Sequence, residues 1–418
     1  MTILIQNVLH ENKNVDILIN KGRFAKIAPA LSLSAESADT VIDGSDKAIL
    51  PAFYNLHTHA AMSLLRGLGD DKELFHWLSE DIWPREAKFD DEIIYWGTKL
   101  AMLEMIRSGT VAFSDMYFEQ KAIMQAVCDM GLRAAVSFVQ MDFFEQEKTE
   151  AKKADTAKFL ALENPCPERI SKVMAVHAVY TVSEELIRFA VQTAEENNMF
   201  LHIHACETRK EVEDCIAAHG CSPIEYLEKL GALSPRTILA HAVHLSDIDI
   251  DIILKHGVKL CTNPASNLKL CSGAFMFKKL WDKGAFITLG TDGSASNNNV
   301  SMLDEMKLAA LSAKLQSGDP TAAAAEQVFQ AATRNGAEAL GIDAGVIAEG
   351  KLADCILVDL NNTLLIPNYN LISNMVYSAD SSVIDTVLCN GRILMLNKKI
   401  DGETEIISQA RKIAAQLS

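Results

Sequence analysis

The stretch MFLHIHAC, residues 199–206, is a short apolar run interrupted only by two histidines. It is one of eight such runs, and segments with helical periodicity separate them, for example residues 91–109 and 183–198. Apolar strands that are buried on both faces and alternate with helices are typical of parallel βαβ units. Eight units within about 240 residues match a (β/α)8 barrel, so the sequence predicts an α/β fold of the TIM-barrel type. The other seven runs are residues 49–59, 110–118, 133–142, 173–180, 237–245, 257–266 and 285–294.

The two ends of the chain have a different pattern. Near the start, apolar and polar residues alternate on both sides of Lys21-Gly22, and near the end they do so around Asn390-Gly391. Asn-Gly between two such runs is a strong signal for a two-residue hairpin. We therefore expect a small β-sandwich-like domain built from both chain ends. The expected division is residues 1–52 and 352–400 for this domain, 53–351 for the catalytic barrel, and 401–418 for a terminal helix.

Composition and charge restrict the class of protein. The chain has 418 residues, of which 49% are hydrophobic and 22% are charged, as expected for a folded protein with a sizeable core. A net charge of −16 argues against a nucleic-acid partner, which would require a basic face. No apolar run is long enough to span a bilayer, so we expect no membrane partner.

The cysteines and the N-terminus bear on the cellular compartment. The chain has nine cysteines, an odd number without a Cys-x-x-Cys pair, which suggests buried thiols in a reducing compartment. The first twenty residues lack the basic-then-apolar layout of a signal peptide. We therefore expect a cytoplasmic protein.

Polar residues stand at the predicted carboxyl ends of several strands, where barrel enzymes build their active sites. His57 and His59 share one face of a strand, and His204 and Asp292 end two others. Three imidazoles and a carboxylate suit one divalent transition metal, Zn²⁺ first, with Fe²⁺ or Ni²⁺ as alternatives. Taken singly, each histidine could satisfy a core hydrogen bond and Asp292 could cap a turn. Their coincidence at the strand ends favours a metal site.

The motifs of the chain resemble those of the metal-dependent amidohydrolase superfamily, and within it the deaminases of S-adenosylhomocysteine, 5′-methylthioadenosine and adenosine. The resemblance runs nearly end to end and rests on LHTHAAMSLLRG, WPRE, DMYF, HACET, AHAVHL, NPASNLKL, TDGSASNN and EGKLADCILVDL. It implies the metal ligands His57, His59, His204 and Asp292. Binuclear members carry a lysine at the end of strand four, where this chain has His177, so the resemblance implies a single metal. It also implies a homo-oligomer, because relatives are commonly oligomeric.

The implied reaction is hydrolytic deamination of an adenosine-type nucleoside to the inosine analogue and ammonia. Attack at C6 requires a hydroxide at neutral pH, which a divalent metal supplies by lowering the pKa of bound water to about 7. Glu207 would carry a proton to the purine ring, Asp292 would take the proton of the water, and His241 would orient the hydroxide. By its sequence alone, Glu207 could also be a surface residue that begins a helix.

Three further residues are expected to bind the substrate. Glu86 resembles the family glutamate that accepts hydrogen bonds from the ribose hydroxyls. Trp83 would form a wall beside the base or sugar, and His177 would contact the substrate. Trp83 and Glu86 belong to residues 72–90, which we expect to form a helix, a turn at Pro84 and a lid over the site.

The chain departs from the family pattern in the residues that would bind the 5′ group of the substrate. Members that act on S-adenosylhomocysteine carry arginines after strand three, but this chain has no arginine between Arg133 and Arg169. Lysine does not readily replace the bidentate grip of arginine on a carboxylate, although a lysine of this loop could still serve. We therefore predict adenosine, 5′-deoxyadenosine or 5′-methylthioadenosine as substrate before S-adenosylhomocysteine.

Two other functions stay open on the sequence. One is a metal-dependent hydrolase of a triazine-like ring or a cyclic amide, which would release chloride or an opened ring instead of ammonia. The other is a non-catalytic structural relative, which the full set of predicted ligands disfavours.

His202 shares the face of His204 but lies about 6.6 Å deeper in the strand, so we expect it beneath the metal. Asn267 and Ser294 are weaker candidates, in polar loops around the site.

Overall fold

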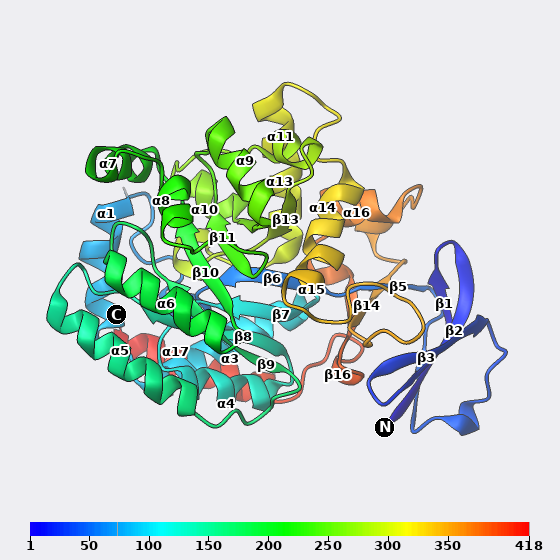
Figure 1. Cartoon of the computed structure of the whole chain (residues 1–418). Helices are drawn as coiled ribbons and strands as arrows, with labels where there is room; N and C mark the ends of the chain where they lie inside the picture. Colours follow the sequence, from blue (N-terminus) through cyan, green and yellow to red (C-terminus); the bar gives the residue numbers. More distant parts are fainter. Residues whose placement is uncertain (73, 418) are drawn as a thin grey trace.

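The chain folds into a parallel barrel with helices outside it and a separate sheet at one side (Figure 1). The structure is a computed structural model that describes residues 1–72 and 74–417. Glu73, within the predicted lid 72–90, and Ser418, the last residue of the predicted terminal helix, lie outside the described residues. The (β/α)8 barrel and the small β domain from both chain ends are confirmed. The division of the chain at residues 52, 351 and 400 stays a prediction.

The barrel strands pair in sequence order. Seven of the eight predicted runs contain one strand each, and the run 173–180 overlaps β9, which begins earlier, at Ile170. Each strand is parallel to its neighbour, and nearly every residue is buried because helices cover the outer face and side chains fill the inside. The strands are β6 Phe53–Thr58, β7 Thr110–Asp115, β8 Arg133–Gln140, β9 Ile170–Val176, β10 Phe200–Ala205, β11 Thr237–His241, β12 Lys259–Thr262 and β13 Phe286–Leu289.

The barrel closes between β6 and the residues that follow β13. The Asp292 N–H donates to the His57 carbonyl at 2.9 Å. Beneath it, the Asn55 side chain donates to Thr291 Oγ1 at 2.7 Å and accepts the Thr291 N–H at 3.0 Å. This closure brings two of the predicted metal ligands together, although they are far apart in the sequence.

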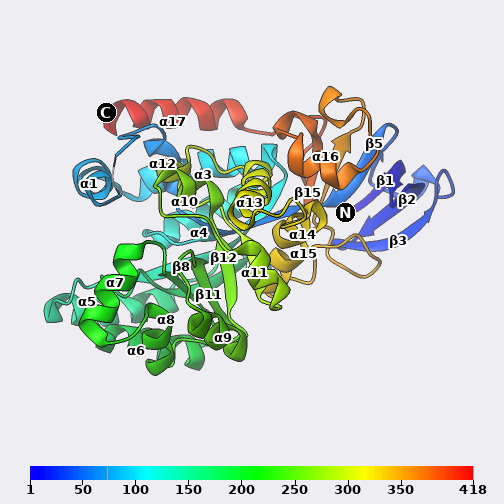
Figure 2. The ribbon, with the colours of Figure 1, turned by 90° about the horizontal axis from the view of Figure 1, so that it is seen from above.

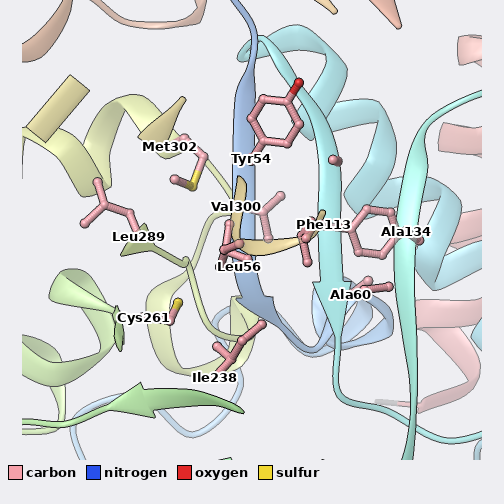
Figure 3. Packing of buried hydrophobic residues seen from close by; sticks show 14 of the residues in the cluster. Tyr54, Leu56, Ala60, Phe113, Ala134, Ile238, Cys261, Leu289, Val300 and Met302 are labelled. Carbon is pink, nitrogen blue, oxygen red and sulfur yellow. The ribbon is translucent and has the colours of Figure 1, made fainter. Parts of the chain in front are cut away.

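Helices surround the barrel and complete the βα units. Figure 3 shows Leu56 of β6 and Phe113 of β7 among apolar side chains that include Met302 of the covering helix α13. The longer helices are α3 Asp91–Arg107, α4 Gln120–Met130, α5 Gln146–Ala161, α6 Glu184–Glu196, α7 Arg209–His219, α9 Asp247–His256 and α13 Met302–Ser317. The shorter ones are α8 Pro223–Lys229, α10 Pro264–Lys269, α11 Phe277–Asp282, α12 Ser294–Asn297, α14 Ala325–Ala332, α15 Arg334–Ala339 and α16 Leu371–Tyr377.

The terminal sheet has its own apolar core. Both predicted hairpins are confirmed, since β2 pairs with β3 and β15 with β16, each antiparallel. The sheet forks at β1, which pairs with β2, with β4 and, at Leu9, with β5. Side chains from both chain ends, such as Ile17 and Leu357, fill this second core. The strands are β1 Thr2–His10, β2 Lys13–Asn20, β3 Arg23–Pro29, β4 Thr40–Asp43, β5 Lys47–Pro51, β14 Cys355–Asp359, β15 Ile384–Cys389 and β16 Arg392–Met395.

The C-terminal helix α17, Glu403–Leu417, packs on the outside of the barrel beside α3 (Figure 2). Among the described residues, no helix is both long enough and apolar enough to cross a bilayer.

The predicted lid differs from expectation at Pro84. Helix α1, Leu74–Trp77, continues through a π-helical turn, Leu78–Ile82, into α2, Trp83–Glu86. The expected turn at Pro84 is therefore wrong. Proline is tolerated here because it lies in the first turn of α2, immediately after the π-helical turn.

The expectation of nine buried thiols is also wrong. Cys128 of α4 and Cys166, in the segment before β9, form a disulfide with a Cα–Cα distance of 6.0 Å. The two segments meet because Arg169 donates to the carbonyls of Val127 and Leu132 from beside Cys166. Of the seven free cysteines, Cys271 is exposed and the others are buried.

Candidate metal centre and active site

A cavity of about 380 Å³ opens at the carboxyl ends of the barrel strands. His57 does not line the cavity; it is fully buried and approaches the site from below. The size suits a small-molecule ligand. All the other predicted site residues line it: His59, Trp83, Glu86, His177, His204, Glu207, His241 and Asp292.

The four predicted metal ligands converge at the floor of this cavity. His57 Nε2 lies 3.1 Å from His204 Nε2 and 3.5 Å from Asp292 Oδ1, and His59 Nε2 lies 3.2 Å from the same carboxylate oxygen. Tetrahedral ligands at Zn–N distances of 2.0–2.1 Å are about 3.3 Å apart from one another. These three spacings are close to that value. The donor atoms fall into two groups that share His57, namely His57–His59–Asp292 and His57–His204–His241, and within each group all donor atoms lie within 4.8 Å of one another.

Hydrogen bonds at the far nitrogens show which way the imidazole lone pairs point. His59 Nδ1 donates to the Met116 carbonyl at 2.7 Å, and His204 Nδ1 donates to the His177 carbonyl at 2.8 Å. A carbonyl can only accept, so each Nδ1 carries a proton and each Nε2 faces the centre of the site. His204 Nε2 therefore presents its lone pair and lies 3.1 Å from His57 Nε2, a distance at which the two nitrogens either share a proton or bind one cation. This arrangement fits a divalent metal.

Burial sets the charge of these groups. Desolvation lowers the pKa of His57 to about 4 and that of His204 well below its ordinary value, so both are neutral, as metal binding requires. Burial also acts to lower the pKa of His59, but its hydrogen bond and charge contact with Asp292 outweigh this and raise it to about 9. A cation at the site would take the place of that proton.

Asp292 and His241 both have unusual backbone conformations. Their φ angles are 59° and 71°, in the left-handed region that non-glycine residues seldom adopt. Such conformations cost about 1–3 kcal/mol each and cluster at functional sites. They turn the chain where β11 ends and just after β13, so that both side chains point into the site.

His241 and Glu207 form the next pair of groups. His241 Nε2 lies 3.7 Å from Glu207 Oε2, and its Nδ1 is hydrogen-bonded to Asn267 Oδ1 at 2.8 Å. The Glu207 carboxylate also accepts a hydrogen bond from Ser272 Oγ at 3.3 Å. The alternative interpretation of Glu207 as a surface residue is wrong, because it is only 9% exposed and lines the cavity.

The three predicted substrate-binding residues lie around the upper wall. Glu86 accepts a hydrogen bond from the Tyr117 hydroxyl, and burial raises the pKa of its carboxyl group. His177 Nδ1 is hydrogen-bonded to Thr181 Oγ1 at 2.7 Å, and burial lowers its pKa to about 4. Trp83 is 39% exposed and makes an edge contact with the ring of Phe143.

His202 lies beneath the converging ligands, as its position two residues deeper in β10 predicts. Its Nε2 is 3.2 Å from His57 Nδ1, and its Nδ1 is 3.1 Å from Ser114 Oγ. It can therefore orient the ring of His57. Of the weaker candidates, Asn267 bonds to His241, while the buried Ser294 hydroxyl has no partner within the described part of the chain.

Three buried carboxylates near the site are absent from the sequence-based prediction. Asp115 accepts the Ala60 N–H at 2.9 Å, and Glu211 accepts the N–H groups of Cys206 and Glu207. Burial raises the pKa of Glu211 to about 7. Glu305, on α13, is fully buried behind Asp292. Two of them have a sequence signal. Asp115 begins the DMYF motif at the end of a strand, and Glu211 stands in the Thr208-x-x-Glu211 pattern of a helix start, although its side chain bonds to the preceding turn instead of to Thr208.

Comparison with known proteins agrees with this geometry. Residues 48–394 match the model of the amidohydrolase family. The chain is 44% identical to "5-methylthioadenosine/S-adenosylhomocysteine deaminase 1" of Archaeoglobus fulgidus, over 97% of this chain and 98% of the relative. It is 43% identical to the 5′-deoxyadenosine deaminase of Methanothermobacter thermautotrophicus, over 94% and 91%.

The fold of the chain is also similar to that of a solved structure. An adenosine deaminase from Xanthomonas campestris with bound zinc superimposes with a TM-score of 0.91, at 30% identity, over 100% of this chain and 98% of that one. The matching family model and the full-length relatives lead to the same conclusion. The chain belongs to the amidohydrolase family.

Proposed function

We propose that the protein catalyses the metal-dependent hydrolytic deamination of an adenosine-type nucleoside to the inosine analogue and ammonia. The observation that carries this proposal is the position of the Glu207 and Asp292 carboxylates, which line one cavity above converging imidazoles. The names of the relatives at 43–44% identity support the nucleoside as substrate.

The metal would be held by His57, His59, His204 and Asp292. Three nitrogen donors and one carboxylate favour Zn²⁺, with Fe²⁺ or Ni²⁺ as alternatives. When bound, a divalent ion lowers the pKa of a coordinated water to about 7 and so supplies a hydroxide at neutral pH.

Glu207 would act as the proton carrier. Attack at C6 places negative charge on the purine ring, and a proton on the neighbouring ring nitrogen removes that charge. In its protonated form, Glu207 would deliver this proton and would recover one from the C6 hydroxyl when ammonia leaves. Its side chain lines the cavity and is held by Ser272 and by the two backbone hydrogen bonds that Glu211 accepts in the turn.

Asp292 and His241 would handle the attacking water. Asp292 Oδ1 lies at the floor of the cavity, where it can accept the proton of the water and later pass it to the leaving amine. His241 has its Nδ1 fixed by Asn267, so its Nε2 faces the same space and can orient the water.

The nucleoside itself would be bound by the upper wall. The Glu86 carboxylate would accept hydrogen bonds from the ribose hydroxyls, His177 would contact the purine, and Trp83 would cover one face of the substrate. Homo-oligomer formation, cytoplasmic localisation, and the absence of nucleic-acid and membrane partners stay predictions.

The end of the cavity formed by β8 and α5 bears on the 5′ group. Phe138, Val139 and Met141 line it with apolar atoms, and Lys152 is the one lysine or arginine among the lining residues. Its Nζ donates to the Val139 carbonyl at 3.2 Å, and the charge of Asp155, which also lines the cavity, acts on it. We propose that small uncharged 5′ groups are preferred and that Lys152 lends a secondary capacity for a carboxylate.

A panel of adenosine analogues tests this proposal. Ammonia release and the change in ultraviolet absorbance would be measured for adenosine, 5′-deoxyadenosine, 5′-methylthioadenosine and S-adenosylhomocysteine. We expect kcat/KM to be lowest for S-adenosylhomocysteine. Lys152→Met should lower that value a further tenfold or so, a change of about 1.4 kcal/mol, and leave 5′-methylthioadenosine unchanged. The highest kcat/KM for S-adenosylhomocysteine would show the preference to be wrong, and release of chloride or an opened ring without deamination would show the reaction to be wrong.

A further inference from the structure

Glu305 is a fully buried carboxylate that does not line the cavity, yet both of its oxygens are used close to the active site. Oε2 accepts the Ala265 N–H, at the start of α10, at 3.0 Å. Oε1 accepts the Asn297 side-chain amide, at the end of α12, at 2.6 Å. A single side chain of α13 thus joins two short helices that are 30 residues or so apart in the sequence.

These two helices hold the Asp292 carboxylate. Ser266 of α10 and Ser296 of α12 place their hydroxyl groups 2.6 Å and 3.1 Å from Asp292 Oδ2. Both bonds are made by Oδ2, which leaves Oδ1 directed toward His57 and His59. The positions of α10 and α12 therefore determine how Asp292 faces the metal ligands.

Helix α10 also holds His241. Asn267, next to Ser266, is hydrogen-bonded to His241 Nδ1 at 2.8 Å, and Asn263, the residue before α10, lies 3.3 Å from the same nitrogen. A shift of α10 would therefore move Asp292 and His241 together.

We propose that Glu305 is a positioning residue that sets metal affinity and turnover by fixing α10 and α12 against Asp292 and His241. Its effect on turnover rests on the proposed function, whereas its effect on metal affinity does not. Partners of this kind, outside the ligands themselves, typically change metal affinity or activity by about 10–100-fold.

Burial raises the pKa of Glu305 to about 8, although the hydrogen bonds from Ala265 and Asn297 act to lower it. Both of these neighbours are donors, so the ionised carboxylate satisfies them best. Asn297 Nδ2 already uses one hydrogen on the Thr291 carbonyl at 2.7 Å, which fixes the amide with its nitrogen toward Glu305. A glutamine at position 305 could accept from Ala265 or from Asn297, but its own NH₂ group would then oppose the other donor. Glu305→Gln is therefore a test that keeps volume and changes only the acceptor.

Glu305→Gln should weaken metal binding about 10–100-fold and lower kcat by a similar factor, with KM within about twofold of the original. Metal affinity would be measured by competition with a chelating dye, kinetics on 5′-methylthioadenosine, and folding by circular dichroism. Asp354→Asn is the matched control, because Asp354 is an equally buried carboxylate between amide, hydroxyl and guanidinium donors at the other end of the barrel. The control should lose stability and keep its metal affinity.

A second variant tests the same proposal if Glu305→Gln does not fold. Asn297→Ala removes the α12 arm of the contact, together with the hydrogen bond from Asn297 to the Thr291 carbonyl, and leaves the arm to Ala265. It should weaken metal binding at least threefold. Unchanged metal affinity in the folded variant, or a loss that only follows stability as in Asp354→Asn, would overturn the proposal. If the original protein deaminates no adenosine analogue, the proposed function fails, and metal affinity alone still decides the role of Glu305.

Discussion

The barrel contains buried polar groups at both of its ends, and the two sets differ in one respect. At the amino-terminal end, Asp354 accepts hydrogen bonds from Tyr54, the Asn390 N–H and Arg133, whose Nε lies 2.9 Å away. Arg133 in turn donates to the Glu168 carbonyl and to the side chain of Asn390. Every charge there has its partner within the chain.

At the carboxyl-terminal end, several histidines and a carboxylate converge beside an open cavity. His57 Nε2 lies 3.1 Å from the unprotonated Nε2 of His204, and Asp292 and His241 hold left-handed backbone conformations. A buried polar network that is complete by itself stabilises the fold, whereas one that needs a cation indicates a site. The difference between the two ends separates structural from functional residues without any reference to relatives.

The largest expected effect comes from Glu207→Gln, a substitution at the carboxyl-terminal end of the barrel that leaves all predicted metal ligands in place. Loss of a general acid–base group typically costs about 10²–10⁴-fold, so we expect kcat to fall about a thousandfold. Metal content per chain, measured by atomic emission, should stay at the original level. Retained turnover would remove Glu207 from the role of proton carrier.

The second largest effect is expected at the amino-terminal end of the barrel. Asp354→Ala leaves the Arg133 guanidinium buried without its carboxylate, and breaking such a pair costs about 3 kcal/mol of unfolding free energy. Urea unfolding measures this loss. Below the unfolding transition, metal content and kcat/KM should match the original, and a loss of metal in the folded variant would erase the distinction between the two ends.

A smaller effect should appear in the pH dependence of stability. Burial raises the pKa of Glu211 to about 7 from an ordinary value near 4.5, so the folded state binds this proton more tightly than the unfolded state. Its contribution to stability is therefore full below about pH 4.5 and is lost as the pH rises through 7.

Between pH 5 and pH 8, Glu211→Gln should reduce the change of the unfolding free energy with pH by about 2 kcal/mol. The comparison uses the difference between variant and original protein at pH 5 and pH 8, which cancels the titration of all other groups. A difference that does not change with pH would mean that Glu211 is ionised throughout this range.

The sequence allowed the barrel to be predicted because its signals are local. Eight apolar runs, each long enough for one strand and separated by helices, match the strand count of a (β/α)8 barrel. The converging ligands could be predicted for the same reason, since His57, His59, His204 and Asp292 stand at strand ends that a barrel brings to one rim.

Other features depend on contacts between distant residues and have no such signal. Glu305 looks like any acidic residue in a helix, and only the packing of α13 against α10 and α12 gives it a role. The Cys128–Cys166 disulfide depends on how Arg169 draws the segment before β9 against α4. The continuous helix through Pro84 depends on a π-helical turn that no residue pattern predicts.

One measurement tests the central claim most directly. The protein, purified with its metal, would be given 5′-methylthioadenosine while ammonia and the purine absorbance are followed, before and after removal of the metal with a chelator. We predict stoichiometric ammonia with conversion to the inosine-type chromophore, loss of both on chelation, and recovery when Zn²⁺ is restored. Full metal occupancy without ammonia from this or any other adenosine analogue would contradict the account.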